Sequence, residues 1–182
     1  RELRQPIWMG ASSIRTRSDG LAALERLSVP LDFEAAARCA GDRGAYLLVL
    51  RVEEALNCAV GSLGQVRFAP GYHVYVGSAM GGLSARLARH LRKAKSHHWH
   101  IDYLLARLPR RSIRSLPIRS PHRLECPLAR EVAALAAGHL PRFGSSDCSC
   151  PSHLYYFPDD PLRSESFLRV LLRFRHDLAL RP

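Results

Sequence analysis

Apolar runs of strand length alternate with turn-forming residues between about residues 42 and 157. The longest run, Tyr-Leu-Leu-Val-Leu-Arg-Val over residues 46–52, predicts a strand that is buried on both faces near the middle of a sheet. Pro117 interrupts a weaker run, which favours an edge strand there. Glycines and prolines over residues 53–71 predict hairpin excursions. Further strands are predicted over residues 72–76, 113–118 and 154–157.

Helical periodicity is clearest where apolar residues recur every three or four positions. Leu83, Leu87 and Leu91 lie on one such stripe and predict a helix that ends near Lys93. The four helices expected after the first strands cover residues 83–93, 100–108, 125–137 and 167–180. Shorter helical patches are predicted near the N-terminus, over residues 18–27 and 33–39.

These elements predict an α/β fold of the α+β type, in which helices flank a small mixed or antiparallel sheet. Residues 1–17 mix arginine, proline, serine and glycine without a period, and neither a repeat nor a low-complexity linker divides the chain. We therefore expect an N-terminal extension over residues 1–41 and one domain over residues 42–182. A chain of 182 residues is long enough to bury a core.

The formal net charge of +11 predicts a surface that attracts polyanions, of which nucleic acid is the commonest in cells. The basic excess is almost entirely arginine, because Lys93 and Lys95 are the only lysines. A GC-rich coding bias would produce the same excess. Charge alone therefore leaves both interpretations open.

The five cysteines form an odd set without the regular spacing of a small secreted scaffold, which favours a reducing compartment. No apolar run approaches the roughly 20 residues that a membrane span requires. We therefore expect a soluble intracellular protein, in the cytoplasm or associated with the nucleoid, with no membrane partner. Residue 1 is not methionine, so the chain could begin within a longer product.

Two tripeptides, Gly44-Ala45-Tyr46 and Tyr75-Val76-Gly77, each place a tyrosine and a glycine on a predicted strand. The second is followed by a glycine-rich turn and then by a helix that carries Arg86 and His90. Four residues separate this pair, so both side chains lie on one helix face. Such a set would suit attack on a phosphodiester, provided that a carboxylate holds a metal ion nearby.

This ordered set resembles the GIY-YIG nuclease superfamily. The longer pattern YVGSAMGGLSARLARHLR, HWHIDYLL, LECPLA and GSSDCSCPSHLYYF resembles a subgroup whose members occur alone or joined to DNA-repair glycosylases. The resemblance covers about residues 42–157, with Ala45 and Val76 in place of the family's isoleucines. It implies hydrolysis of DNA phosphodiester bonds with one Mg²⁺ or Mn²⁺ ion. The implied partners are DNA, in branched, flapped or damaged form, and a DNA-repair enzyme.

The resemblance also implies roles for individual residues. Tyr46 would activate the attacking water, with support from Tyr75. Arg86 would stabilise negative charge that grows on the phosphoryl oxygens. His90 would assist proton transfer or bind a phosphate. Each tyrosine alone could equally be a sheet aromatic, and Arg86 a solvated helix residue.

The metal-holding glutamate of the family lies on a later helix, and Glu125 is the first candidate because it begins the next suitable helix. Glu131 on the same helix is the rival ligand. Glu125 could instead only complement the positive end of the helix dipole. Further candidates, for contact with substrate, are Ser78, Arg89, Lys93, His98, His100 and Ser146.

A second set of residues, Cys126, Cys148, Cys150 and His153, offers thiolate and imidazole ligands that could form a tetrahedral zinc site. The spacing is not that of a standard zinc knuckle, and inert buried thiols are the competing interpretation. Two alternatives to a nuclease thus stay open. One is a non-cleaving nucleic-acid-binding module with the same fold, and the other is a zinc-stabilised interaction domain.

Overall fold

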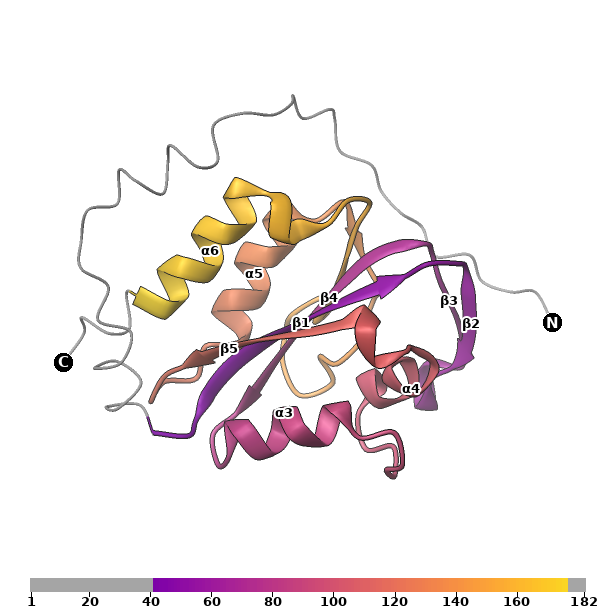
Figure 1. Ribbon diagram of the computed structural model, residues 1–182, viewed down its shortest axis with the longest axis horizontal. Coiled ribbons are helices and arrows are strands. Elements are labelled where there is room, and N and C mark those ends of the chain that lie inside the picture. Colours follow the sequence, from indigo (N-terminus) through magenta and orange to yellow (C-terminus); the bar gives the residue numbers. More distant parts are fainter. Residues whose placement is uncertain (1–40, 177–182) are drawn as a thin grey trace.

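The computed structural model describes residues 41–176. The helices expected over residues 18–27 and 33–39 lie outside these residues, as does the end of the helix expected to reach residue 180. The domain boundary after residue 41 therefore stays a prediction. The architecture of the described part confirms the expected α+β class, with helices on both faces of a small sheet (Figure 1).

Five strands form one sheet in the order β5-β1-β4-β7-β6, and every pairing in it is antiparallel. The sequence left a mixed and an antiparallel sheet open, and the structure shows the antiparallel one. A separate hairpin pairs β2 with β3 and accounts for the excursion predicted after the first strand. The strands are β1 (Gly44–Val52), β2 (Leu56–Ala59), β3 (Gln65–Phe68), β4 (Gly71–Ala79), β5 (Ile113–Arg119), β6 (Gly138–His139) and β7 (Leu154–Phe157).

Strand positions follow the apolar pattern closely. The longest apolar run, residues 46–52, forms most of β1. This strand lies between β4 and β5 and is almost entirely buried. Pro117 lies in β5 at the sheet edge, where its missing N–H disrupts no ladder on the outer side. The two-residue strand β6 was not predicted, because a strand this short carries no periodicity.

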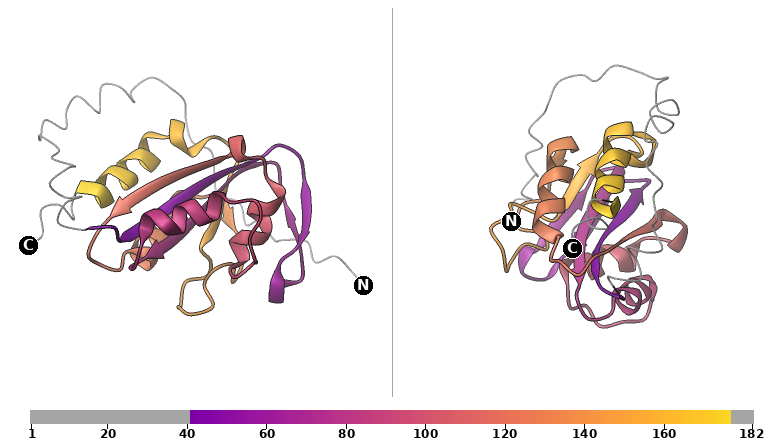
Figure 2. Two further views of the ribbon diagram at one scale, coloured as in Figure 1. Left: turned by 60° about the horizontal axis from the view of Figure 1, so that its bottom comes forward. Right: turned by 90° about the vertical axis from the view of Figure 1, so that its left-hand side faces the viewer.

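Four helices occur in the described part of the chain, and they lie on opposite sides of the sheet in pairs. Figure 2 shows α3 and α4 on one side and α5 and α6 on the other. The four helices predicted after the first strands are thereby confirmed, with ends shifted by a few residues where the structure describes them. Their bounds are α3 (Leu83–Leu91), α4 (His100–Arg107), α5 (Glu125–Leu135) and α6 (Glu165–His176), and short 3-10 turns cover Gly61–Leu63, Arg110–Ser112 and Pro161–Arg163.

Alternate side chains of β1 serve two hydrophobic cores, because successive residues of a strand point to opposite faces. Tyr46, Leu48 and Leu50 join residues of α3, α4 and the β2–β3 hairpin. Leu47 and Val49 join residues of α5 and α6 on the other face. A strand with apolar residues at nearly every position is the expected result of this three-layer arrangement.

Candidate active site and neighbouring cysteine cluster

The structure has a pocket of about 320 Å³. Its walls come from β1, β4, α3, the start of α4, the first residue of α5 and the loop before β7, so segments far apart in the sequence meet there. Eight of the residues predicted for catalysis or substrate contact line it. The full lining is Tyr46, Tyr75, Ser78, Arg86, His98, Trp99, His100, Glu125, Gly144, Ser146 and Asp147.

The two tripeptides come together because β1 and β4 pair in register, with Tyr46 directly opposite Gly77. The phenol ring of Tyr46 occupies the space over this glycine. A Cβ atom at Gly77 would lie 2.4 Å from both Cζ and Oη of Tyr46, which no side chain could tolerate without moving the ring. The glycine of the second tripeptide is therefore required by the tyrosine of the first.

Three polar groups form a chain behind the pocket. The hydroxyl of Tyr46 lies 2.8 Å from Nε2 of His90, within hydrogen-bond distance. Nδ1 of the same imidazole lies 3.7 Å from Oδ1 of Asp102. Tyr46 and His90 are each 1% exposed and Asp102 is fully buried, and of the three residues only Tyr46 lines the pocket. The order phenol, imidazole, carboxylate is one in which a proton could pass to the imidazole and be stabilised there.

Burial controls the ionisation of the two tyrosines and of His90. It raises the pKa of Tyr46 well above its usual value, and the positive charge of Arg86 only partly opposes this rise. Burial also raises the pKa of Tyr75 and lowers the pKa of His90. At pH 7 both tyrosines are thus neutral phenols, and the imidazole of His90 is neutral and able to accept a proton.

Asp102 also anchors the segment between α3 and α4. Its carboxylate accepts hydrogen bonds at 3.1 Å from both terminal nitrogens of Arg89, and it lies 3.3 Å from Nζ of Lys95. It further accepts from the backbone N–H groups of His98 and Trp99, and it thereby caps the start of α4. Burial opposes ionisation, but the imidazole of His90, the backbone N–H groups of His98 and Trp99 and the charge of Lys95 hold the pKa of Asp102 well below its usual range.

Trp99 lies between two arginines at the pocket wall. The guanidinium carbon of Arg86 is 4.1 Å from the indole ring centroid, and that of Arg89 is 4.4 Å from it. Such contacts favour a planar cation over the ring face. Arg86 lines the pocket, whereas Arg89 is turned to Asp102, so of the two helical arginines only Arg86 is available to a ligand in the pocket.

Glu125 begins α5 and lines the pocket. The hydroxyl of Ser78 donates a hydrogen bond to its Oε2, and Nδ1 of His153 lies 3.2 Å from its Oε1. Burial works against ionisation here, but the imidazole of His153 and the hydroxyl of Ser78 lower the pKa of Glu125. The carboxylate is therefore ionised at neutral pH and able to hold a cation.

The remaining candidates fall into two groups. His98, His100 and Ser146 line the pocket, and the backbone N–H of Gly144 donates to Nδ1 of His100. Lys93 and Glu131 do not line it. Lys93 is exposed beyond the end of α3, and the carboxylate of Glu131 lies 2.8 Å from the guanidinium of Arg173 on α6.

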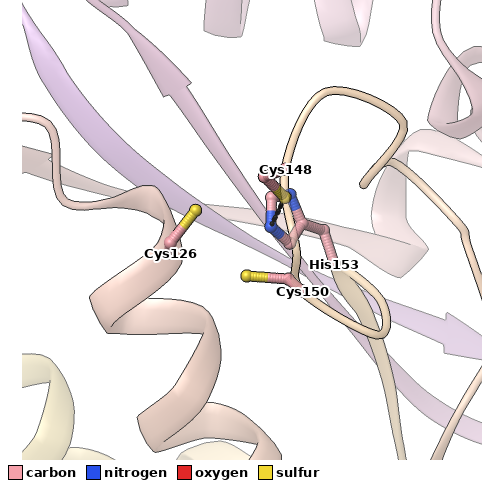
Figure 3. Close-up of side chains that lie close together, drawn as sticks. All are labelled: Cys126, Cys148, Cys150 and His153. Atoms are coloured by element: carbon pink, nitrogen blue, oxygen red, sulfur yellow. Dashed lines mark hydrogen bonds between the residues drawn. The ribbon is translucent and has the colours of Figure 1, made fainter.

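Cys126, Cys148, Cys150 and His153 form a cluster beside the pocket, and we call it the Cys–His cluster. Their ligand atoms all lie within 4.8 Å of one another, so the group could hold a metal ion. Figure 3 shows Cys126 on the helix and the other three residues on the facing loop. Sγ of Cys148 is 3.5 Å from Nε2 of His153. Burial and the neighbouring thiols raise the pKa of Cys150 to about 12.

The sequence profile of a family described as domain of unknown function DUF123 matches residues 45–175. The chain belongs to the DUF123 family. The match spans every residue of the pocket and of the Cys–His cluster, so both are parts of the DUF123 domain. No curated protein and no solved structure matches the chain significantly. Within residues 41–176, no helix has the length and apolar character needed to cross a membrane.

Several features of the DUF123 site were not predicted. The sequence pattern did not predict that Asp102 lies beside His90 or that Trp99 contacts the guanidinium of Arg86. His153 was considered only as a zinc ligand, and its contact with Glu125 was missed. All three contacts join residues that are 12 or more positions apart in the sequence, and no local spacing reports them.

Proposed function

We propose that this DUF123 domain is a metal-dependent endonuclease that hydrolyses DNA phosphodiester bonds by the chemistry of the GIY-YIG nucleases. The observation that carries the proposal is that Tyr46, Arg86 and Glu125 line one pocket, although they come from a strand and two helices. A proton acceptor, a fixed cation and an ionised carboxylate are the groups that this hydrolysis requires.

In the proposed reaction, water forms a bond to phosphorus while the bond from phosphorus to the leaving oxygen breaks. Tyr46 is a neutral phenol, so it accepts the water proton only as its own proton moves to Nε2 of His90, 2.8 Å away. The lowered pKa of His90 keeps its imidazole neutral and ready for this proton. Asp102 then stabilises the imidazolium.

Glu125 is the residue that would hold a divalent ion. Its carboxylate faces the pocket and is ionised at neutral pH because its pKa is lowered. Mg²⁺ retains several waters and accepts substrate oxygens as ligands, so one carboxylate is sufficient. When bound, such an ion neutralises charge on the phosphoryl and leaving oxygens. Asp147, exposed on the facing loop, adds a second carboxylate to the same pocket.

Arg86 would stabilise the charge that develops on the phosphoryl oxygens. Its guanidinium is held against Trp99, so its orientation is fixed before substrate arrives. The net charge of +11 would draw DNA to the domain and make binding salt-dependent.

For the Cys–His cluster we propose Zn²⁺ as the occupant. Three thiols and one imidazole form a Cys₃His donor set, which suits tetrahedral zinc. Sulfur atoms around such an ion lie about 3.8 Å apart. Ligand atoms already within 4.8 Å of one another therefore need only a small closure. The cluster shares no residue with the pocket lining, so a zinc ion there is compatible with the nuclease proposal.

The nuclease proposal is tested by incubating the protein with labelled linear, nicked and branched DNA in Mg²⁺ or Mn²⁺. We expect cleavage by the wild type and a loss of about 100-fold or more in Tyr46→Phe, Arg86→Ala and Glu125→Gln. Glu131→Gln on the same helix is the matched control and should cleave normally, because Glu131 lies outside the pocket.

Two results would overturn this assignment in different ways. Cleavage that persists unchanged in all three variants would place the active site elsewhere. Tight, salt-sensitive DNA binding without cleavage by the wild type would favour the non-cleaving module. Metal analysis of the purified protein tests the zinc proposal, which expects one zinc per chain and its loss in Cys148→Ser.

A further inference from the structure

We infer that His153 couples the Cys–His cluster to the active site, so that metal in the cluster holds Glu125 in the position from which it binds the catalytic ion. The inference rests on the proposed function for its catalytic part. It assigns His153 as a positioning residue, because its imidazole touches a catalytic carboxylate and lies within the metal-binding cluster.

The two ring nitrogens of His153 face two different groups. Nε2 lies 3.5 Å from Sγ of Cys148, and Nδ1 lies 3.2 Å from Oε1 of Glu125. The side chain is 1% exposed, so water does not compete for either nitrogen. Within residues 41–176, Nδ1 makes no hydrogen bond of good geometry, and its polar contact is this carboxylate at 3.2 Å. His153 is therefore suited to link the two sites.

The backbone of His153 is fixed on both sides, which makes the link stiff. Its N–H donates to the carbonyl of Phe143 at 2.8 Å, and its carbonyl accepts from the N–H of Val76 at 2.9 Å. The first contact joins it to the loop that lines the pocket, and the second joins it to β4. Movement of the imidazole is thus restricted to rotation about its own side-chain bonds.

A metal ion on Nε2 would set the state of the ring. Coordination requires an unprotonated Nε2, so the proton of the neutral imidazole resides on Nδ1, where it can be donated to Glu125. Without metal, the proton can lie on either nitrogen and the ring is free to turn. Carboxylate–histidine–metal arrangements of this kind orient both the ligand and the carboxylate.

The cluster also holds the main chain next to Glu125. Cys126 follows Glu125 directly in the first turn of α5, so a metal bound to its thiolate would tie the helix start to the facing loop. Ser78 occupies the other carboxylate oxygen, Oε2, from β4. Glu125 would then be held through the main chain by metal-bound Cys126, and at its two carboxylate oxygens by His153 and Ser78.

The first test measures the effect of Glu125 on the cluster and needs no nuclease activity. Coupling between two sites is reciprocal, so loss of the carboxylate should weaken metal binding at the cysteines. We expect zinc transfer to a chromophoric chelator to be about 10-fold faster in Glu125→Gln than in the wild type. Glu131→Gln is the control and should release zinc at the wild-type rate. Equal rates in all three proteins would overturn the inference.

The second test measures the effect of the cluster on Glu125, with Mn²⁺ as the probe and paramagnetic resonance as the readout. We expect zinc-depleted protein and Cys148→Ser to bind Mn²⁺ about 10-fold more weakly than the zinc-loaded wild type. His153→Cys offers four thiolates for zinc but no imidazole, and it should show the same loss at full zinc content. Normal Mn²⁺ affinity in His153→Cys with full zinc would overturn the coupling.

These outcomes separate the inference from the nuclease proposal. Coupled zinc and Mn²⁺ binding without DNA cleavage would reject the nuclease and leave the link between the sites intact. Cleavage by the wild type together with uncoupled metal binding would support the nuclease proposal and overturn the link between the sites. If His153→Cys fails to fold or to retain zinc, the Glu125→Gln release rate decides, because that variant leaves every cluster ligand in place.

Discussion

The hydroxyl of Tyr46 lies 2.8 Å from Nε2 of His90, although 44 residues separate them in the chain. One lies in the central part of the sheet and the other near the end of α3, and both are nearly inaccessible to water. Burial makes the phenol a poor base alone, because its pKa is raised. The imidazole of His90 lies within hydrogen-bond distance and can take this proton, and the predictions below test the groups around this pair.

Acid should destabilise the domain through His90. Its pKa is lowered in the folded state by burial, so the unfolded chain binds a proton at higher pH than the folded chain does. The free energy of unfolding is thus unaffected by this group above pH 6.5 and decreases as the pH falls below that value. The slope approaches about 1.4 kcal/mol per pH unit for one proton.

The measurement is urea unfolding of the wild type and His90→Gln at pH 7.5 and pH 5.5. His73 and His100 also have lowered pKa values, but they contribute equally to both proteins. We expect the wild type to lose more stability between these pH values than the variant. An identical loss in both proteins would show that folding does not lower the pKa of His90.

Arg86→Lys tests whether the planar shape of the cation matters as well as its charge. Lysine keeps the positive charge but cannot lie flat on Trp99 or present two N–H groups to one phosphate. We expect the single-turnover cleavage rate to fall at least about 10-fold, while DNA affinity at low salt changes by less than about 2-fold.

The matched control for this change is Arg92→Lys, an exposed arginine just after α3. It carries the same substitution without a pocket contact and should cleave at the wild-type rate. A parallel loss of cleavage and of DNA binding in Arg86→Lys would contradict the assigned role, since it would make Arg86 a contributor to binding alone.

The sequence was sufficient for most of the fold because local patterns determine it. The continuous apolar run predicted β1, and Pro117 correctly indicated an edge strand. The tripeptides and Glu125 were likewise visible, and the structure brings Tyr46, Tyr75 and Glu125 to one pocket. What the sequence could not report are contacts between distant polar groups. Asp102 has the same local pattern whether it only caps a helix or also holds His90.

Gly77→Ala should displace the tyrosine of the site. The added methyl group would lie 2.4 Å from the phenol oxygen of Tyr46, and the ring has no room to yield within a buried core. Overpacking of this kind costs about 1–3 kcal/mol of stability. We expect a lower urea midpoint together with loss of cleavage.

Gly81→Ala provides the comparison, because a Cβ atom there meets nothing within 4 Å. Both changes add one methyl group to a glycine of the same segment. Only the change at Gly77 should affect the site. Wild-type stability and cleavage in Gly77→Ala would mean that the phenol is not held over the glycine.

Asp102→Asn tests how far the buried carboxylate supports the site. Asparagine still accepts hydrogen bonds from backbone N–H groups, so the cap of α4 is retained while the charge is lost. The change leaves Lys95, whose side chain is 5% exposed, and Arg89, at 20%, without their common counter-charge. Breaking a buried ion pair from one side costs about 3–5 kcal/mol, and we expect a loss of that size in urea unfolding.

The control is Asp160→Asn, which removes an acid that pairs with the exposed Arg114. Surface pairs contribute less than about 1 kcal/mol, so this variant should unfold close to the wild type. Equal effects of the two substitutions would mean that the Asp102 network is solvated. In that case neither the low pKa of the carboxylate nor its support of the His90 imidazolium could hold, and the proton route from Tyr46 would lack its final acceptor.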